Sequence, residues 1–135
     1  MNVLVIDAQG GGIGRQVVSS LKKRFPAIEI TAVGTNSMAT AAMLKAGADH
    51  GATGENPVMV CARQADIIVG PVGIVIADAM YGEITPNMAL AVGQSRAKRI
   101  LIPVNHCDNI IVGAADFALS QLVEQVVELV GKEMK

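Results

Sequence analysis

The sequence predicts an α/β fold: a single doubly wound, mostly parallel, Rossmann-like sheet with helices on both faces. Short apolar runs alternate with segments of helical period along the 135 residues. The first run, residues 2–7, leads through a glycine-dense turn into a helix. Proline and small polar residues mark several later helix starts. We therefore expect strand order 3-2-1-4-5 with right-handed crossovers, one further short strand, and a single domain over residues 1–135.

The individual elements follow from periodicity and from the residues that start and stop helices. The expected strands cover residues 2–7, 29–33, 48–53, 66–69, 99–104 and, as the short extra strand, 110–113. The expected helices run from near Ile13 to Pro26, over 38–46 with Ser37 as N-cap, over 57–64 with Asn56 as N-cap, over 86–94 with Thr85 as N-cap, and over about 119–130. The apolar segment 74–80 is expected in the core, with some contact to a second copy of the chain.

Composition excludes several classes of function. Apolar residues make up 51% of the chain, the net charge is −1, and Phe25, Tyr81 and Phe117 are the only aromatic residues. A nucleic-acid binder would normally show a basic face and stacking platforms. No run of eighteen apolar residues and no signal peptide is present, so we expect neither a membrane span nor export. Cys61 and Cys107 are too few for a disulfide framework, which favours a cytoplasmic protein with reduced thiols.

Residues 9–14, the glycine loop, have the chemistry of a phosphate cradle. Glycines permit a tight turn and close approach of a ligand, and the first amides of the following helix attract an anion. In this sheet order the turns 7–14, 34–37, 70–73 and 105–109 are expected to meet at one crevice. The residues predicted to bind a ligand there are Gln9, Gly10, Gly11, Gly12, Ile13, Gly14, Arg15, Thr35, Asn36, Ser37, Gly70, Pro71 and Gly73. The expected ligand is a nucleotide, a dinucleotide such as NAD(P), or another phosphate-bearing molecule, with Mg²⁺ as a conceivable companion.

The loop departs from the familiar phosphate-binding motifs. A strict Gly-x-Gly-x-x-Gly fails, because the sixth position counted from Gly10 is Arg15, and a Walker-type loop fails at Arg15 and Gln16. Asp7 would repel a phosphate dianion, so it either binds the loop amides itself or faces the phosphate through Mg²⁺. The acid that holds an adenosine ribose is missing after the second strand, where residues 34–36 would instead suit a 2′-phosphate with help from Arg15. The alternative that the glycines serve only helix–sheet packing stays open.

No complete catalytic set is visible. Asp7, Glu83 and Asn105 are the candidates for an enzyme that acts on a phosphorylated metabolite, with a site completed by a homodimer. Glu83 also precedes a helix start, where a carboxylate is favourable without any function. The sequence His106-Cys107-Asp108 cannot close a tetrahedral metal site, and no protein metal site is expected. A third interpretation is an interaction scaffold whose glycine loop is purely structural.

Five stretches give the chain a resemblance to a known family. They are residues 6–14 (IDAQGGGIG), 34–37 (GTNS), 51–56 (GATGEN), 69–71 (VGP) and 82–86 (GEITP). In this order they resemble a family of small bacterial proteins that is catalogued only as a domain of unknown function. The resemblance covers nearly the whole chain. It implies a stand-alone Rossmann-like domain in the cytoplasm of bacteria, and it brings no known substrate, cofactor or catalytic residue.

Overall fold

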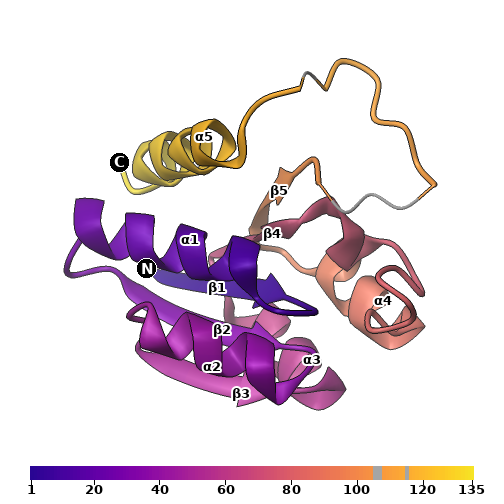
Figure 1. Cartoon of the computed structure of the whole chain (residues 1–135). Coiled ribbons are helices and arrows are strands. Elements are labelled where there is room, and N and C mark those ends of the chain that lie inside the picture. Colours follow the sequence, from indigo (N-terminus) through magenta and orange to yellow (C-terminus); the bar gives the residue numbers. More distant parts are fainter. Residues whose placement is uncertain (105–107, 115) are drawn as a thin grey trace.

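The computed structural model describes residues 1–104, 108–114 and 116–135. Within them, five strands form one sheet in the order β3-β2-β1-β4-β5, and every strand pair is parallel (Figure 1). The strands are β1 (Asn2–Asp7), β2 (Glu29–Gly34), β3 (His50–Thr53), β4 (Ile67–Pro71) and β5 (Lys98–Ile102). The predicted Rossmann-like order is confirmed. The order reverses between β1 and β4, so the carboxyl ends of these strands flank the expected crevice.

Helices cover both faces of the sheet, as expected for a doubly wound fold. The first face carries α1 (Gly12–Arg24), α2 (Ser37–Lys45) and α5 (Leu119–Glu133). The second face carries α3 (Glu55–Gln64), the short 3-10 helix η1 (Val72–Val75) and α4 (Pro86–Gln94). Each face has its own hydrophobic core, and both cores are built almost entirely from aliphatic side chains and methionine.

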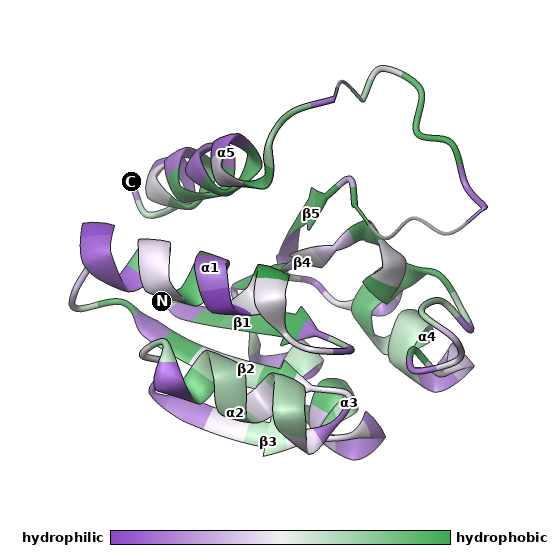
Figure 2. Ribbon diagram, viewed as in Figure 1, coloured by the Kyte–Doolittle hydropathy of each residue, from purple (hydrophilic) through white to green (hydrophobic). Residues whose placement is uncertain are grey.

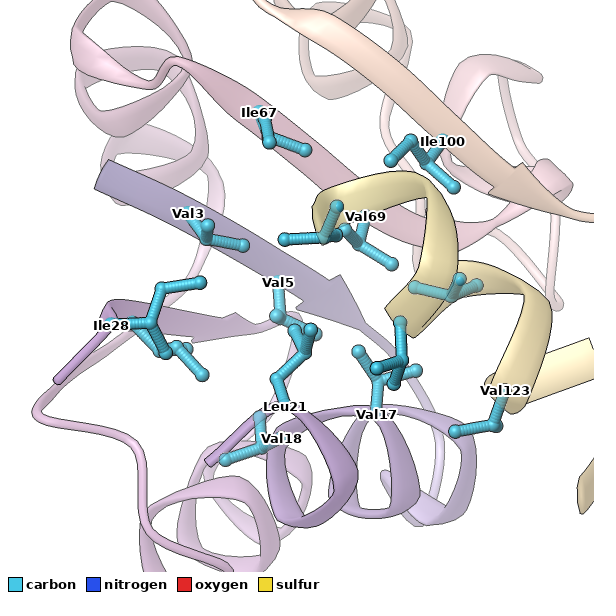
Figure 3. Packing of buried hydrophobic residues seen from close by; sticks show 14 of the residues in the cluster. Val3, Val5, Val17, Val18, Leu21, Ile28, Ile67, Val69, Ile100 and Val123 are labelled. Carbon is cyan, nitrogen blue, oxygen red and sulfur yellow. The ribbon is translucent and has the colours of Figure 1, made fainter. Parts of the chain in front are cut away.

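Strand β1 supplies both cores by the alternation of its side chains. Val3 and Val5 pack on the first face with Leu21 of α1, and Leu4 and Ile6 pack on the second. Figure 3 shows the first of these cores, where side chains from α1, α5 and the strands interdigitate. Figure 2 shows β1 as mostly hydrophobic and the far end of α1 as hydrophilic. Because β1 is buried on both sides, its carboxyl end at Asp7 is held firmly.

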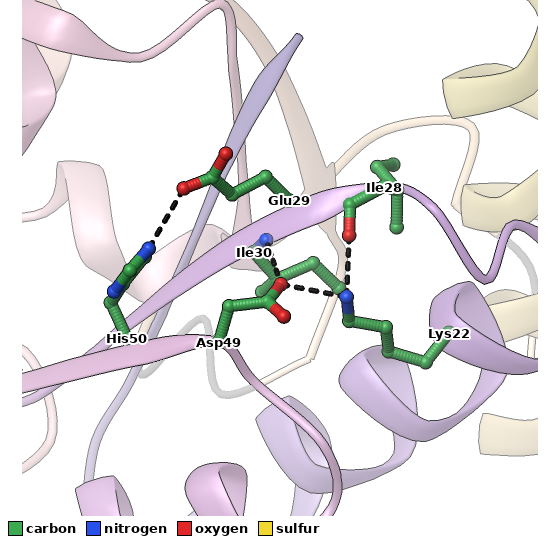
Figure 4. A network of polar contacts seen from close by, with 6 residues as sticks. All are labelled: Lys22, Ile28, Glu29, Ile30, Asp49 and His50. Carbon is green, nitrogen blue, oxygen red and sulfur yellow. Dashed lines mark hydrogen bonds and ion pairs between the residues drawn. The ribbon is translucent and has the colours of Figure 1, made fainter.

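A polar network links the amino ends of β2 and β3 to α1 (Figure 4). It lies at the opposite end of the strands from the glycine loop. Lys22 pairs with Asp49 at 2.7 Å and also donates to the carbonyl of Ile28. Asp49 accepts the amide of Ile30 at 2.8 Å. Lys22 therefore links helix α1 to the sheet.

Two expected helix starts are wrong by one or two residues. Asn36, and not Ser37, is the N-cap of α2: its side chain accepts the amide of Ala39 at 2.9 Å. Helix α3 begins at Glu55 with Gly54 as its N-cap, so Asn56 is not a cap and Pro57 is the third helical residue. Proline is tolerated there because the first amides of a helix have no intrahelical partner.

The expected extra strand is also wrong. Residues 110–113 pair with no strand in the described part of the chain and lie exposed on the long connection to α5 (Figure 1). Strand β5 ends at Ile102, two residues earlier than expected. The apolar segment 74–80 begins within η1 and continues as tight turns, with Ile74, Ala79 and Met80 buried in the second core.

Candidate functional site

Two glycines of the loop are required by packing. Gly11 has φ +74°, and a Cβ on it would lie 2.8 Å from Cα of Ala39 and 2.9 Å from its carbonyl oxygen. A Cβ on Gly14 would lie 2.5 Å from Sδ of Met43 and 3.0 Å from Cβ of Asp7. Both glycines are buried, and they let α1 and α2 approach the end of β1. The packing interpretation therefore accounts for these two residues.

The other two glycines have no such requirement. A Cβ on Gly10 or Gly12 would meet nothing within 4 Å, and neither residue has a positive φ. Both are exposed. Within the part of the chain that the structure describes, their amide N–H groups meet no acceptor. Gly10 and Gly12 thus form an open stretch of backbone with free donors, and the exposed residue Arg15 follows in the first turn of α1.

The carboxylate of Asp7 binds one backbone amide in the first turn of α1 and another just before the glycine loop. One carboxylate oxygen accepts the amide of Gly14 at 2.7 Å, and the other accepts the amide of Ala8 at 2.8 Å. The Asp7 side chain lies beneath the loop, and the residue is only 2% exposed. In this conformation Asp7 organises the loop and does not face solvent, so it is poorly placed to touch a substrate.

Glu83, from a distant part of the sequence, also lies at the carboxyl ends of β1 and β2. Its Oε1 atom accepts three hydrogen bonds: from the Gln9 amide at 2.8 Å, from Oγ1 of Thr35 at 2.6 Å and from Nδ2 of Asn36 at 2.9 Å. Asn36 also donates to the carbonyl of Gln9 at 2.9 Å. Gln9 has φ +52°, which is unusual for a residue other than glycine. The carboxylate of Glu83 therefore joins the glycine loop to the end of β2.

The two carboxylates have opposite pKa shifts. Burial raises the pKa of Asp7, the hydrogen bonds from Gly14 and Ala8 oppose this, and the nearby charge of Glu83 adds to it. Burial also acts to raise the pKa of Glu83, but the hydrogen bonds from Thr35, Gln9 and Asn36 outweigh it and lower that pKa. Glu83 thus stays ionised at neutral pH and gives the edge of the site a negative charge.

The backbone around Glu83 is held on both sides. Before it, Asp78, Met80 and Tyr81 all have positive φ, and the Asp78 amide donates to the carbonyl of Ile84 at 2.7 Å. After it, Thr85 caps α4 by accepting the amide of Met88 at 3.1 Å. The Thr85 hydroxyl also donates to Glu55 at the start of α3. Left-handed conformations at non-glycine residues cost energy and persist only where the surroundings impose them.

The remaining predicted site residues are placed less favourably. Gly70 and Pro71 belong to β4, Gly73 belongs to η1, and all three are buried. A Cβ on Gly70 would lie 2.6 Å from the carbonyl oxygen of Ile6, so this glycine serves the close approach of β4 to β1. Ile13 is half-buried and Ser37 is exposed. Asn105, His106 and Cys107 lie outside the described residues.

Three further findings concern the described residues as a whole. In the described part of the chain, no three His, Cys, Asp or Glu side chains are grouped so as to hold a metal ion. None of the helices described has the length and apolar character needed to cross a membrane. A wide groove of about 930 Å³ lies away from the glycine loop, between α1 and α5. It is lined by residues of both charges and includes none of the predicted site residues.

Comparison with known proteins places the chain in a family. It belongs to the family described as Domain of unknown function (DUF3842), whose model matches residues 2–135. This confirms the resemblance drawn from the five stretches of sequence. No curated protein matches the sequence.

Two solved structures have a similar fold. Apo saccharopine dehydrogenase (L-Glu forming) from Saccharomyces cerevisiae is 13% identical with a TM-score of 0.49, over 89% of this chain and 23% of that one. A dodecameric FMN-dependent UbiX-like decarboxylase from Escherichia coli O157:H7 is 15% identical with a TM-score of 0.47, over 97% of this chain and 76% of that one. The chain therefore spans less than a quarter of the dehydrogenase. At such identities the similarity concerns the fold alone.

Proposed function

For this member of an uncharacterised family, we propose that the protein binds a nucleotide or a related phosphate-bearing small molecule at the glycine loop. The phosphate lies against the free amides of Gly10 and Gly12, and the rest of the ligand extends toward Thr35 and Asn36 at the end of β2. Adenine nucleotides and NAD-type dinucleotides are the expected ligands.

The open backbone at Gly10 and Gly12 is the observation that carries the proposal. Packing requires glycine at Gly11 and Gly14, but the fold leaves room for a side chain at the other two positions. Glycine at these two positions loses more conformational entropy on folding than alanine would, and packing does not require it, so another reason is needed. Close approach of a ligand to main-chain donors supplies that reason.

The charges near the loop define how a phosphate would be held. The carboxylates of Asp7 and Glu83 oppose a bare dianion, because like charges at short range repel. Arg15 lies exposed one turn into α1 and supplies a cation. Mg²⁺ carried by the nucleotide would screen the remaining charge, since it prefers phosphate and carboxylate oxygens and keeps several waters.

The experiment is a thermal-shift and calorimetric screen with ATP, ADP, AMP, NAD and NADP, each with and without Mg²⁺. A ligand at about a hundred times its Kd stabilises the native state by about 2.7 kcal/mol. Gly12→Ala should weaken the binding found while leaving the protein at least as stable as the wild type. Gly93→Ala is the matched control: this exposed glycine in α4 also has open space around it, but it lies in another helix.

Two outcomes would count against the proposal. One is the absence of any shift across the panel. The other is equal loss of affinity in Gly12→Ala and Gly93→Ala. A change of stability in Gly12→Ala without any change of ligand affinity would instead favour the scaffold interpretation, in which the glycine loop is purely structural.

Three further properties belong to the same proposal. We expect the 135 residues to fold as a single domain, to act in the bacterial cytoplasm with reduced thiols, and to form a homodimer. Size-exclusion chromatography with light scattering tests the last of these.

A further inference from the structure

The end of β2 carries a carboxylate that the local sequence does not provide. Residues 34–36 are Gly34, Thr35 and Asn36, all uncharged. The structure brings Glu83 onto this end, where Thr35 and Asn36 both donate to it. In dinucleotide-binding folds, the acid after the second strand accepts a hydrogen bond from the ribose 2′-hydroxyl. Here Glu83, which comes from a different segment of the chain, lies where that acid would be.

The two oxygens of Glu83 are unequally used. All three of its hydrogen bonds end on Oε1. Across residues 1–104, 108–114 and 116–135, Oε2 receives no donor. The Glu83 side chain is therefore anchored through one oxygen and retains the other as an acceptor. Glu83 is partly exposed, so a ligand hydroxyl has access to it.

The side-chain donors suited to a 2′-phosphate are already engaged. Thr35 and Asn36 were the polar residues available for such a group, and both now hydrogen-bond to Glu83. Asn36 uses its carbonyl oxygen on the amide of Ala39 and its amide group on Gln9 as well. A phosphate placed at this end of β2 would meet a carboxylate and no free side-chain donor from either residue.

We propose that Glu83 is the ribose-recognition residue of the site and that it selects ligands with a free 2′-hydroxyl. Its Oε2 atom accepts a hydrogen bond from the ribose 2′-hydroxyl of the ligand. Its charge excludes ligands with a 2′-phosphate, so NAD is accepted and NADP is rejected. This inference rests on the proposed function and narrows it to ribonucleotides without a phosphate on the 2′-oxygen.

The experiment compares matched ligands by isothermal titration calorimetry. The pairs are ATP with dATP, ADP with dADP, AMP with dAMP, and NAD with NADP. In every pair that the wild type binds, we expect it to bind the first ligand about ten to a hundred times more tightly than the second, because the 2′-hydroxyl donates to a charged acceptor.

Glu83→Gln is the informative variant, because glutamine keeps the shape and the anchoring oxygen but loses the charge. It should reduce the preference for the 2′-hydroxyl to about two- to tenfold, since a hydrogen bond between neutral groups contributes less. It should also admit NADP. Glu29→Gln is the matched control at the opposite end of β2, where Glu29 is exposed and pairs with His50. It should retain the wild-type preference.

The possible results separate the role of Glu83 from nucleotide binding itself. Equal affinity of the wild type for both members of a binding pair overturns the role of Glu83 and leaves nucleotide binding intact. A preference that persists in Glu83→Gln does the same. Binding of no member of any pair overturns both the inference and the proposed function. The wild-type comparison decides the matter even if Glu83→Gln proves unstable.

Discussion

Substitution of the loop glycines by alanine should separate those that the fold needs from those that it does not. Gly11→Ala is the severe change. Its φ of +74° costs a residue other than glycine about 1–2 kcal/mol. The new Cβ would also stand 2.8 Å from Cα of Ala39, a backbone atom that moves only with α2. Overpacking of this kind costs about 1–3 kcal/mol, so the loss of unfolding free energy should total about 2–5 kcal/mol.

The neighbouring variants provide the scale. Gly12→Ala meets no atom within 4 Å and places alanine in the first turn of α1, so it should be neutral or stabilising by up to about 1 kcal/mol. Gly14→Ala should fall between the two, because the atom nearest to its Cβ is Sδ of the flexible Met43 side chain.

Thermal unfolding followed by far-ultraviolet circular dichroism measures the series directly. For a chain of this length, the expected loss in Gly11→Ala lowers the Tm by roughly 6–20 °C. The Tm of Gly12→Ala should stay at or above the wild-type value. Equal Tm values for Gly11→Ala and wild type would refute the close contact with Ala39. A large loss of Tm in Gly12→Ala would show that Gly12 lacks the free space that the structure gives it.

Other predictions concern the cap of α2 and the network at the far edge of the sheet. Asn36→Ala should lower the unfolding free energy by about 1–2 kcal/mol through loss of the bond to the Ala39 amide, whereas Ser37→Ala should change it by less than about 0.5 kcal/mol in urea titrations. The hydrogen bond from Lys22 lowers the pKa of Asp49, so Asp49 stabilises the fold above its unfolded pKa of about 3.9, and this contribution is lost as pH falls through the lowered native pKa. Asp49→Asn should therefore cost up to about 1 kcal/mol at pH 7, given the exposure of the pair, and progressively less in acid. A Tm difference between wild type and Asp49→Asn that does not change with pH would contradict this account.

Much of the fold follows from the sequence because the responsible signals are local. Apolar runs of strand length alternate with helical periods, and right-handed crossovers then leave few strand orders. The errors lie where local chemistry permits two answers. Asn36 and Ser37 are both good cap residues, and backbone conformation decides for Asn36. Residues 110–113 are apolar enough for a strand, but a strand needs a partner, and the described sheet ends at β5.

The site is less predictable because its decisive contacts span long distances in sequence. Glu83 precedes a helix-capping threonine, so local reasoning offers it both an ordinary role in helix electrostatics and a role as a catalytic candidate. Nothing in its neighbourhood indicates that it meets Thr35, 48 residues away. By contrast, the idea that Asp7 binds the loop amides follows from its place at the end of β1, and the structure confirms that contact.

The position of Asp7 also explains why the loop departs from the phosphate-binding motifs. A phosphate loop leaves its helix-start amides unpaired, and the ligand satisfies them. Here the Asp7 carboxylate satisfies the Gly14 amide, so the loop keeps its shape without a ligand. The cost is a buried carboxyl group whose pKa is raised by burial, and the nearby charge of Glu83 adds to that shift. A ligand that meets this surface gains more from hydroxyl donors and an accompanying cation than from bare negative charge. Of the two carboxylates only Glu83 is accessible, so under the proposal made above it is Glu83 that favours a ligand with a ribose hydroxyl.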